Sequence, residues 1–333
     1  MDSEILAAAP LTGFEDNPVV RHTGARYPIL QAPMSWIARA DLVSAVSEAG
    51  AMGLLETSGR DLAASMAEAE RARARTDRPF GVNLAVRYLS GDPEREAATL
   101  RWALDGRFTF ATTSAGDPRR YIRRIKDAGV TVYHAVGSLE AALKAQDAGV
   151  DGLVVEGGES AGIRGPQPVH SFVLLQAVRA RVELPIVAAG GVAGGRGMAG
   201  AFALGAQGVA MGTRFVASRE SPVHLNYKAA IVAAQAGDTV RVPFRPGIMG
   251  RVLKTDLSSR VAAGDLDPPP SRNPVRDLYV EGRLDLAMGS AGESAGLVGS
   301  VQSVGEIVEE TVAGFWDELD RLAALARRRP PTP

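Results

Sequence analysis

Short apolar segments recur eight times along the chain, and each is followed by a stretch in which apolar residues have helical spacing. Continuous apolar runs rich in valine, isoleucine and alanine are typical of parallel strands that are buried on both faces. Eight strand–helix units of this kind predict an α/β fold, a (β/α)8 TIM barrel. The predicted strands are residues 28–34, 51–57, 80–86, 108–114, 131–136, 152–157, 185–191 and 208–214.

Glycine separates several predicted helices from the strand that follows. Gly50, Gly129, Gly149 and Gly205 all stand at such a junction. Because glycine readily adopts the left-handed conformation of a C-terminal cap, these positions indicate returns from helix to strand. Active sites in barrels of this class gather at the carboxyl ends of the strands, so candidate chemistry is expected there.

The barrel pattern ends after a predicted helix at 222–236. Residues 241–294 hold clustered prolines and scattered apolar runs, which predicts an extension that wraps the barrel and has no second core. An amphipathic stripe over 304–326 predicts a final helix. The predicted units are a barrel at residues 20–236 and an extension or lid at 237–296. A helix that completes the barrel shell is predicted at 297–326 and a disordered tail at 327–333.

Composition narrows the function. The 333 residues carry a formal net charge of −1, which gives no reason to expect nucleic acid or an anionic membrane as partner. No apolar run approaches the roughly 20 residues of a membrane span, and the acidic N-terminus lacks the basic region of a signal peptide. There is no cysteine, and the four histidines lack paired ligand spacing, so we expect no metal. We expect a cytoplasmic enzyme, with a homodimer left open.

Glycine-rich turns follow the last two predicted strands. Gly190 and Gly191 follow the seventh strand, and Gly212 and Thr213 follow the eighth. Backbone amides at this place, together with the next helix N-terminus, are the usual phosphate site of such barrels. Tight strand-to-helix turns are the alternative explanation, but two glycine signals in adjacent units favour a phosphate-bearing cofactor.

Polar residues also mark the ends of three other predicted strands, namely Asn83, His134 and Glu156. Such groups need a ligand, a partner or water when they are buried. For His134, a hydrogen-bonded core histidine and a cofactor contact remain equally open. The small-residue loop 156–165 follows the sixth strand and could lie flat against a planar ligand, or simply form a flexible surface connection.

These segments resemble a known family. The chain is similar to the nitronate monooxygenase (2-nitropropane dioxygenase) family of FMN-dependent barrels, which also includes flavin enoyl-thioester reductases and NADH:quinone reductases. The matching segments are residues 28–34, 80–83, 148–152, 188–192, 203–215 and 292–297. Details at 33–41, 112–118, 154–159 and 220–224 resemble members associated with the breakdown of CoA thioesters and steroid rings.

The resemblance implies FMN as cofactor, with NAD(P)H as a candidate reductant, and an extension that packs over the cofactor face. By resemblance, residues at several strand ends and loops would surround the flavin. Those near the ring and ribityl chain would be Pro33, Met34, Asn83, His134 and Glu156. Those at the phosphate would be Gly190, Gly191, Met211, Gly212 and Thr213. Those on the surrounding loops would be Ser160, Ala161, Gly162 and Gly292.

One departure bears on the reaction. Ile163 stands where nitronate monooxygenases place a histidine, and isoleucine cannot act as a base. The candidate catalytic residues are therefore Glu156, Ser160 and His170. The favoured function is an FMN oxidoreductase acting at flavin N5 on a small organic or acyl-thioester (CoA-type) substrate. Nitronate monooxygenase proper, an NAD(P)H:quinone or enoyl reductase, and a non-catalytic flavin binder are the alternatives.

Three arginines are candidates for contact with an anionic substrate, with solvated loop positions as the alternative. They are Arg164, Arg214 and Arg245.

Overall fold

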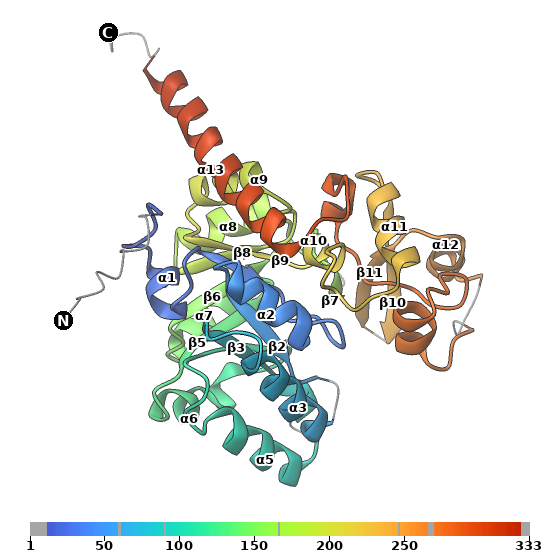
Figure 1. Ribbon diagram of the computed structural model, residues 1–333, viewed down its shortest axis with the longest axis horizontal. Helices are drawn as coiled ribbons and strands as arrows, with labels where there is room; N and C mark the ends of the chain where they lie inside the picture. The colour runs from blue at the N-terminus through green and yellow to red at the C-terminus, as the bar shows by residue number, and fades with distance from the viewer. Residues whose placement is uncertain are drawn as a thin grey trace, which may run out of the picture.

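The computed structural model describes residues 12–58, 61–89, 91–165, 167–245, 247–265 and 270–327. Residues 1–11 and nearly all of the tail predicted at 327–333 lie outside this set. Eight parallel strands form one sheet in the order β1-β9-β8-β6-β5-β4-β3-β2. A parallel bridge between Leu30 of β1 and Met52 beside β2 brings the two edges of the sheet together. The sheet therefore closes into the (β/α)8 barrel predicted from the sequence (Figure 1).

The barrel strands agree closely with the eight apolar segments. Their bounds are β1 Ile29–Gln31, β2 Gly53–Glu56, β3 Phe80–Ala85, β4 Phe110–Ser114, β5 Thr131–Val136, β6 Gly152–Glu156, β8 Ile186–Ala189 and β9 Gly208–Met211. Alternate residues fill the barrel interior, because successive strand side chains point to opposite faces. This interior cluster contains Leu30, Met52, Leu54, Phe110, Tyr133, Val154, Val187, Ala189 and Ala210. The other set packs outward against the helices.

Helices surround the barrel strands on the outside, and several of them begin at a polar cap. Side chains of Asp61, Asp92 and Ser138 accept backbone N–H groups at the starts of α3, α5 and α7. Such caps satisfy donors that the helix itself leaves without partners. The helices of the barrel are α1 Pro18–Thr23, α2 Ala40–Glu48, α3 Leu62–Arg73, α4 Val86–Leu89, α5 Pro93–Ala103, α6 Ile122–Asp127, α7 Leu139–Asp147, α8 Ser171–Arg179, α9 Gly195–Ala203 and α10 Thr213–Val216.

The segment after the barrel builds a small sheet of its own. Strand β10 (Thr239–Arg245) pairs antiparallel with β11 (Ile248–Leu253), and β11 pairs with β7 (Gly162–Arg164) from the loop after β6. Val242 and Val252 pack with Leu257 and Val261 of α12 (Asp256–Ala263) in a separate apolar cluster. The prediction of an extension without a core was wrong here, because the prolines hid a short hairpin. Figure 1 shows this unit beside the barrel.

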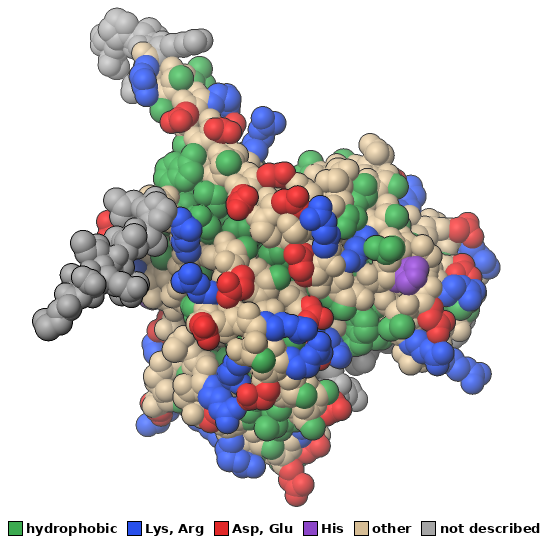
Figure 2. Space-filling view, in the orientation of Figure 1, with side chains coloured by type: hydrophobic (Ala, Val, Ile, Leu, Met, Phe, Trp, Pro, Cys, Tyr) green, Lys and Arg blue, Asp and Glu red, His purple; other side chains and the backbone are tan. Residues whose placement is uncertain are grey.

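The chain then returns to the barrel through short turns and one long helix. The elements are α11 (Leu225–Ala233), the π-helical turn η2 (Val275–Val280), the 3-10 turn η3 (Glu293–Leu297) and α13 (Val304–Ala326). Helix α13 has the predicted bounds and buries Val304, Ile307, Val308, Thr311 and Phe315. Its far end extends beyond the barrel in Figure 1, and hydrophobic side chains gather at its base in Figure 2. Among the described residues, no helix is both long and apolar enough to span a membrane.

Candidate functional site

Polar side chains line the carboxyl-terminal mouth of the barrel at β3 and β4. Asn83 is buried, and its place two residues after Gly81 turns it to the barrel interior. Its Oδ1 accepts hydrogen bonds from the hydroxyls of Thr112 (2.9 Å) and Ser114 (3.3 Å). Both contacts place the Oδ1 atom of the amide toward β4.

Four loops meet on the other side of the mouth, after β1, β6, β8 and β9. Gly190 and Gly191 follow β8 with φ of 95° and 76°. A Cβ on Gly190 would lie 2.7 Å from the Ser160 Oγ, so these two loops are in close contact. After β9, a Cβ on Gly212 would lie 3.7 Å from the Met34 Sδ. The structure therefore brings together residues that the sequence analysis assigned to one site.

The late glycine segment closes over the same place. The Gly292 N–H donates to the Thr213 Oγ1 at 2.9 Å, and the Glu293 N–H donates to the Glu159 carbonyl at 2.9 Å. A Cβ on Gly292 would lie 2.7 Å from that Glu159 carbonyl oxygen. Only glycine fits this close approach. The hydrogen bond between Gly292 and Thr213 joins residues 79 positions apart at the mouth of the barrel.

Helix starts around the mouth differ in how they are capped. The N-terminus of α8 is capped from a distance, because both oxygens of Glu159 accept the Ser171 N–H at 3.0 and 2.9 Å. By contrast, α9 and α10 begin at glycine caps, Gly194 and Gly212, where no side chain of the described residues supplies a cap hydrogen bond. Their first N–H groups and the positive end of the α9 dipole face the end of the barrel where β8 and β9 finish.

His134 faces the helix layer. Its neighbours Tyr133 and Ala135 belong to the interior cluster, and strand side chains alternate. Its Nδ1 lies 2.7 Å from the Thr113 Oγ1. Burial lowers the pKa of His134 to about 4, against the opposing effects of Asp117 and of a backbone hydrogen bond at Gly116. This orientation makes His134 a support of the turn after β4, and a direct ligand contact stays a prediction.

Comparison with known proteins agrees with this geometry. Residues 17–314 match the family model described as nitronate monooxygenase. The chain belongs to the nitronate monooxygenase family. Among the described residues, no group of three or more histidine, aspartate or glutamate side chains could hold a metal ion.

Individual relatives carry different names. A protein of Rhodococcus jostii named (3aS,4S,5R,7aS)-5-hydroxy-7a-methyl-1-oxo-octahydro-1H-indene-4-carboxyl-CoA dehydrogenase is 36% identical over 234 residues, which are 70% of this chain and 64% of the relative. The nitronate monooxygenase of Pseudomonas aeruginosa is 30% identical over 326 residues, with 83% of this chain and 93% of the relative covered. The structure of FabK from Thermotoga maritima has a TM-score of 0.85 and 36% identity, covering 93% of this chain and 99% of that one. This member of the family is therefore an oxidoreductase.

The residue that replaces the family histidine lies in an unexpected place. Ile163 is in the middle of β7, directly opposite Gly250 of β11. A Cβ on Gly250 would meet the Phe244 ring at 1.8 Å, so Ile163, Gly250 and Phe244 share one face of the small sheet. Arg251 projects from the opposite face and reaches the barrel loops. The loop after β6 thus contains the short strand β7, and its Ile163 side chain points away from Arg251.

His170 stands at the start of α8, between the two parts of the molecule. Its Nε2 is 3.9 Å from the Glu293 Oε1, and its ring lies against Gly158. The His170 side chain is about half exposed, at 53%. Together with the buried Ser160 and the half-buried Glu156, it borders the mouth.

Sequence reasoning missed an ion pair at this border. Arg251 is buried, and its Nη2 lies 2.9 Å from the Glu293 Oε1. Its Nε donates to the Gly158 carbonyl oxygen at 3.2 Å, and its Nη1 donates to the Thr239 hydroxyl at 3.0 Å. Arg251 lies in the proline-rich region, where no pattern indicated a strand, so no signal pointed to it.

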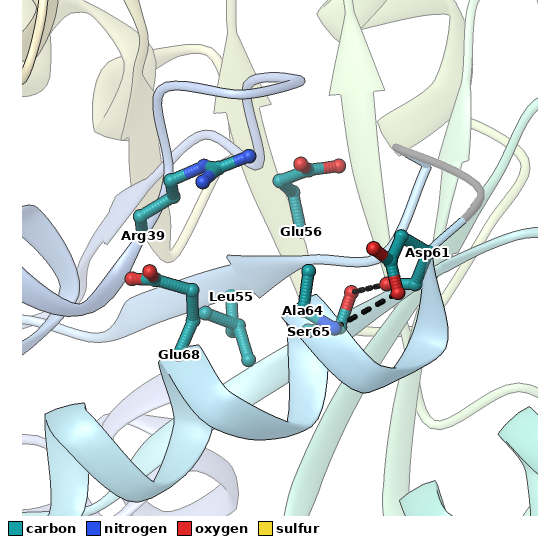
Figure 3. Close-up of a pocket in the computed structure, with 7 residues that line it drawn as sticks. All are labelled: Arg39, Leu55, Glu56, Asp61, Ala64, Ser65 and Glu68. Carbon is teal, nitrogen blue, oxygen red and sulfur yellow. Dashed lines mark hydrogen bonds between the residues drawn. The ribbon is translucent and has the colours of Figure 1, made fainter.

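The sequence analysis also did not identify the carboxylate of Glu56, which holds the loop after β1. Both oxygens of Glu56 are engaged, Oε1 by the Trp36 N–H at 2.9 Å and Oε2 by the Ser58 N–H at 2.7 Å. Trp36 has a φ of 65°, which is strained for a residue with a side chain. Glu56 also borders a cavity of about 30 Å³ with Arg39 and Glu68, shown in Figure 3. That cavity has room for about one water molecule, so it is no cofactor site.

Proposed function

We propose that the chain is an FMN-dependent oxidoreductase that acts in the cytoplasm on a small-molecule acyl thioester. The observation that carries the cofactor is the pair of glycine-started helices α9 and α10 at the ends of β8 and β9. Their N–H groups lack side-chain caps among the described residues, and a phosphate is the group that such helix starts bind best. Positive φ at Gly190 and Gly191 exposes further backbone to the same place.

The remaining residues fit the rest of the cofactor. We assign the phosphate to the backbone of Gly190, Gly191, Gly212 and Thr213. The segment Pro33–Met34 would form one wall of the ring site, since the Met34 sulfur is in contact distance of Gly212. The Asn83 amide would donate to the ring or ribityl chain, and the turn supported by His134 would border it.

The chemistry divides between cofactor and protein. When bound, FMN supplies an acceptor and donor of hydride or single electrons at its N5. The chain's own residues bind and orient the substrate and move protons. We assign proton transfer at the substrate to the carboxylate of Glu156, the hydroxyl of Ser160 or the imidazole of His170, which border the mouth. The loops at 160–162 and 292–295, with the 237–296 extension as a lid, would exclude water.

The substrate class rests on two observations. The Rhodococcus relative is named a carboxyl-CoA dehydrogenase. Ile163 supplies no base, and its side chain lies on the face of the small sheet opposite Arg251. A thioester substrate with NAD(P)H, a quinone or O₂ as second partner is compatible with a site that lacks the nitronate histidine. The Pseudomonas relative favours the second candidate, nitronate monooxygenase, in which a nitronate already carries its negative charge.

The test compares these two functions on one sample. NADH, NADPH and propionate 3-nitronate are added in turn, under air, to the FMN-loaded protein. We expect a nicotinamide to bleach the flavin bands and the nitronate to cause neither bleaching nor oxygen consumption. Nitronate turnover without reduction by a nicotinamide would establish the second candidate instead. Glu156→Gln should retain the bands and slow thioester turnover by about 10² or more if Glu156 transfers the proton.

A further inference from the structure

A hollow beside the mouth of the barrel has no role in the assignments above. It lies at the ends of β3 and β4, has a volume of about 270 Å³ and is open to solvent. Its lining comes from the turn into α4 and from the turn between β4 and η1 (Pro118–Arg120). The lining residues are Val86, Arg87, Ala115, Gly116, Asp117 and Arg120.

The hollow adjoins the polar cluster of the mouth. Ser114, which bonds to Asn83, directly precedes the lining residue Ala115. Ala115 has a φ of 56°, and its carbonyl oxygen accepts the Arg87 N–H at 3.1 Å. A non-glycine residue held in this conformation costs free energy and often marks a functional turn. The hollow therefore adjoins the ends of β3 and β4, next to the hydroxyl that contacts Asn83.

The turn is rigid on its other side as well. A Cβ on Gly116 would lie 2.6 Å from the Val86 Cγ1, so the turn packs directly on the start of α4. His134 lies beneath it, with a backbone hydrogen bond to Gly116. These contacts give the hollow a fixed shape before any ligand arrives, which reduces the ordering cost of binding.

The charge of the hollow is positive. Asp117 is its one lining acid, and that carboxylate is bound by the Arg119 Nε at 3.0 Å, which lowers the pKa of Asp117 to about 2. Two arginines, Arg87 and Arg120, also line the hollow, beside Val86, Ala115 and Gly116. The adjoining segment 117–127 holds five basic and two acidic residues. A field of this sign attracts polyanions to the rim of the mouth.

The arginines predicted for an anionic substrate do not compete for this role. Arg214 is buried, and it donates to the Ser300 carbonyl at 3.1 Å and to the Gln302 side chain. The side chains of Arg164 and Arg245 lie outside the described set. Arg87 and Arg120, by contrast, line the hollow at the ends of β3 and β4.

We propose that this hollow binds the phosphate-bearing nucleotide end of a coenzyme A thioester, with Arg87 and Arg120 as the phosphate contacts. The proposal rests on the proposed function, because it places the carrier of the acyl group at the rim and the acyl group in the mouth. Guanidinium groups suit phosphates because they offer several donors in a fixed plane. Glu96, 2.7 Å from Arg120, competes with the ligand for one of these guanidinium groups.

The test measures binding of coenzyme A, dephospho-coenzyme A and pantetheine to the FMN-loaded protein by calorimetry. We expect coenzyme A to bind at least tenfold more weakly to Arg87→Ala and Arg120→Ala, and pantetheine binding to stay unchanged. The control is Arg123→Ala, which removes an arginine from the same segment outside the hollow and should leave all three ligands unaffected. Glu96→Gln should strengthen coenzyme A binding severalfold, since it releases Arg120.

Three results would overturn the proposal. Coenzyme A and pantetheine could bind the wild-type protein equally well, Arg123→Ala could weaken binding as much as the two hollow variants, or an acyl carrier protein could bind where coenzyme A does not. The flavin bands and their bleaching by a nicotinamide are recorded on the same samples. If these persist while coenzyme A fails to bind, the hollow assignment falls and the flavin oxidoreductase stands.

Discussion

His134 is neutral at physiological pH because of its surroundings. Burial lowers its pKa to about 4, whereas the unfolded chain has a value near 6.5. At pH values between these two pKa values, the imidazole is protonated in the unfolded chain and neutral in the folded protein. The free energy of unfolding therefore falls as the pH drops from about 6.5 to about 4, and this group adds no pH dependence above that window.

The variant His134→Gln tests this account. It should remove a pH-dependent loss on the order of 2–3 kcal/mol across that window, measured by denaturant unfolding at pH 7, 5.5 and 4.5. His224→Asn is the matched control, because His224 caps α11 and asparagine retains a capping acceptor. An unchanged slope in His134→Gln, or an equal change in the control, would contradict the assignment.

The second prediction at this scale concerns Ile163. Because Ile163 shares its sheet face with Gly250 and Phe244, opposite Arg251, a histidine there would not reach the barrel mouth. We expect Ile163→His to change turnover of propionate 3-nitronate by less than about twofold, where a working catalytic base contributes about 10² or more. A rise of that larger size would show that the β7 strand opens during turnover.

At the scale of single residues, the sequence predicted some members of the candidate site and not others. The sequence assigned Asn83, Gly190, Gly212 and Thr213 to the same end of the barrel, since the carboxyl ends of the strands lie on one side. It did not find Arg251, because an arginine in a proline-rich segment has no pattern of its own. Side-chain direction depends on strand register, which the spacing of apolar residues alone does not resolve.

At the scale of elements, the contact between α9 and α13 depends on glycine. A Cβ on Gly195 would lie 2.2 Å from the Phe315 backbone nitrogen and 2.3 Å from the Gly314 carbonyl carbon. Gly200 in the same helix has nothing within 4 Å of its Cβ position. Helix α9 therefore contains one glycine that its packing against α13 requires, Gly195, and one that packing does not require, Gly200.

This contrast gives a paired prediction. Gly195→Ala should lower the free energy of unfolding by about 2 kcal/mol or more, because backbone atoms of α13 cannot yield as side chains do. Gly200→Ala should raise it by about 0.5–1 kcal/mol, since alanine loses less entropy in a helix. Thermal or urea unfolding of the two variants measures both effects. Equal effects of the same sign would show that α13 does not pack against α9 in this way.

Elements were predictable wherever periodicity was strong. The eight strands and the helix Val304–Ala326 follow from it directly. The hairpin β10–β11 did not, because β10 contains Pro243 and because β7, which pairs with β11, is only three residues long. Paired residues of β7 and β11, such as Ile163 and Gly250, are far apart in the chain. Pairing between such distant short segments depends on tertiary contacts and not on local pattern.

For the whole molecule, the Arg251–Glu293 pair joins the small sheet to the barrel mouth. We expect Arg251→Met to lower the free energy of unfolding by about 2 kcal/mol, because Glu293 and the Gly158 carbonyl lose their partner. It should also speed hydrogen exchange in β10 and β11. Arg283→Met removes a surface pair with Asp285 and should change stability by less than about 0.5 kcal/mol. Equal effects of the two variants would refute a linking role for Arg251.

We infer that the starts of α9 and α10, which no described side chain caps, bind the phosphate of FMN. The most direct measurement titrates flavin-free protein with FMN and with riboflavin, which lacks only the phosphate, and follows the visible flavin bands. We predict that FMN binds at least about 100-fold more tightly than riboflavin, because the helix N–H groups contact the phosphate alone. Equal affinities, or no binding of FMN, would contradict the assignment of this site.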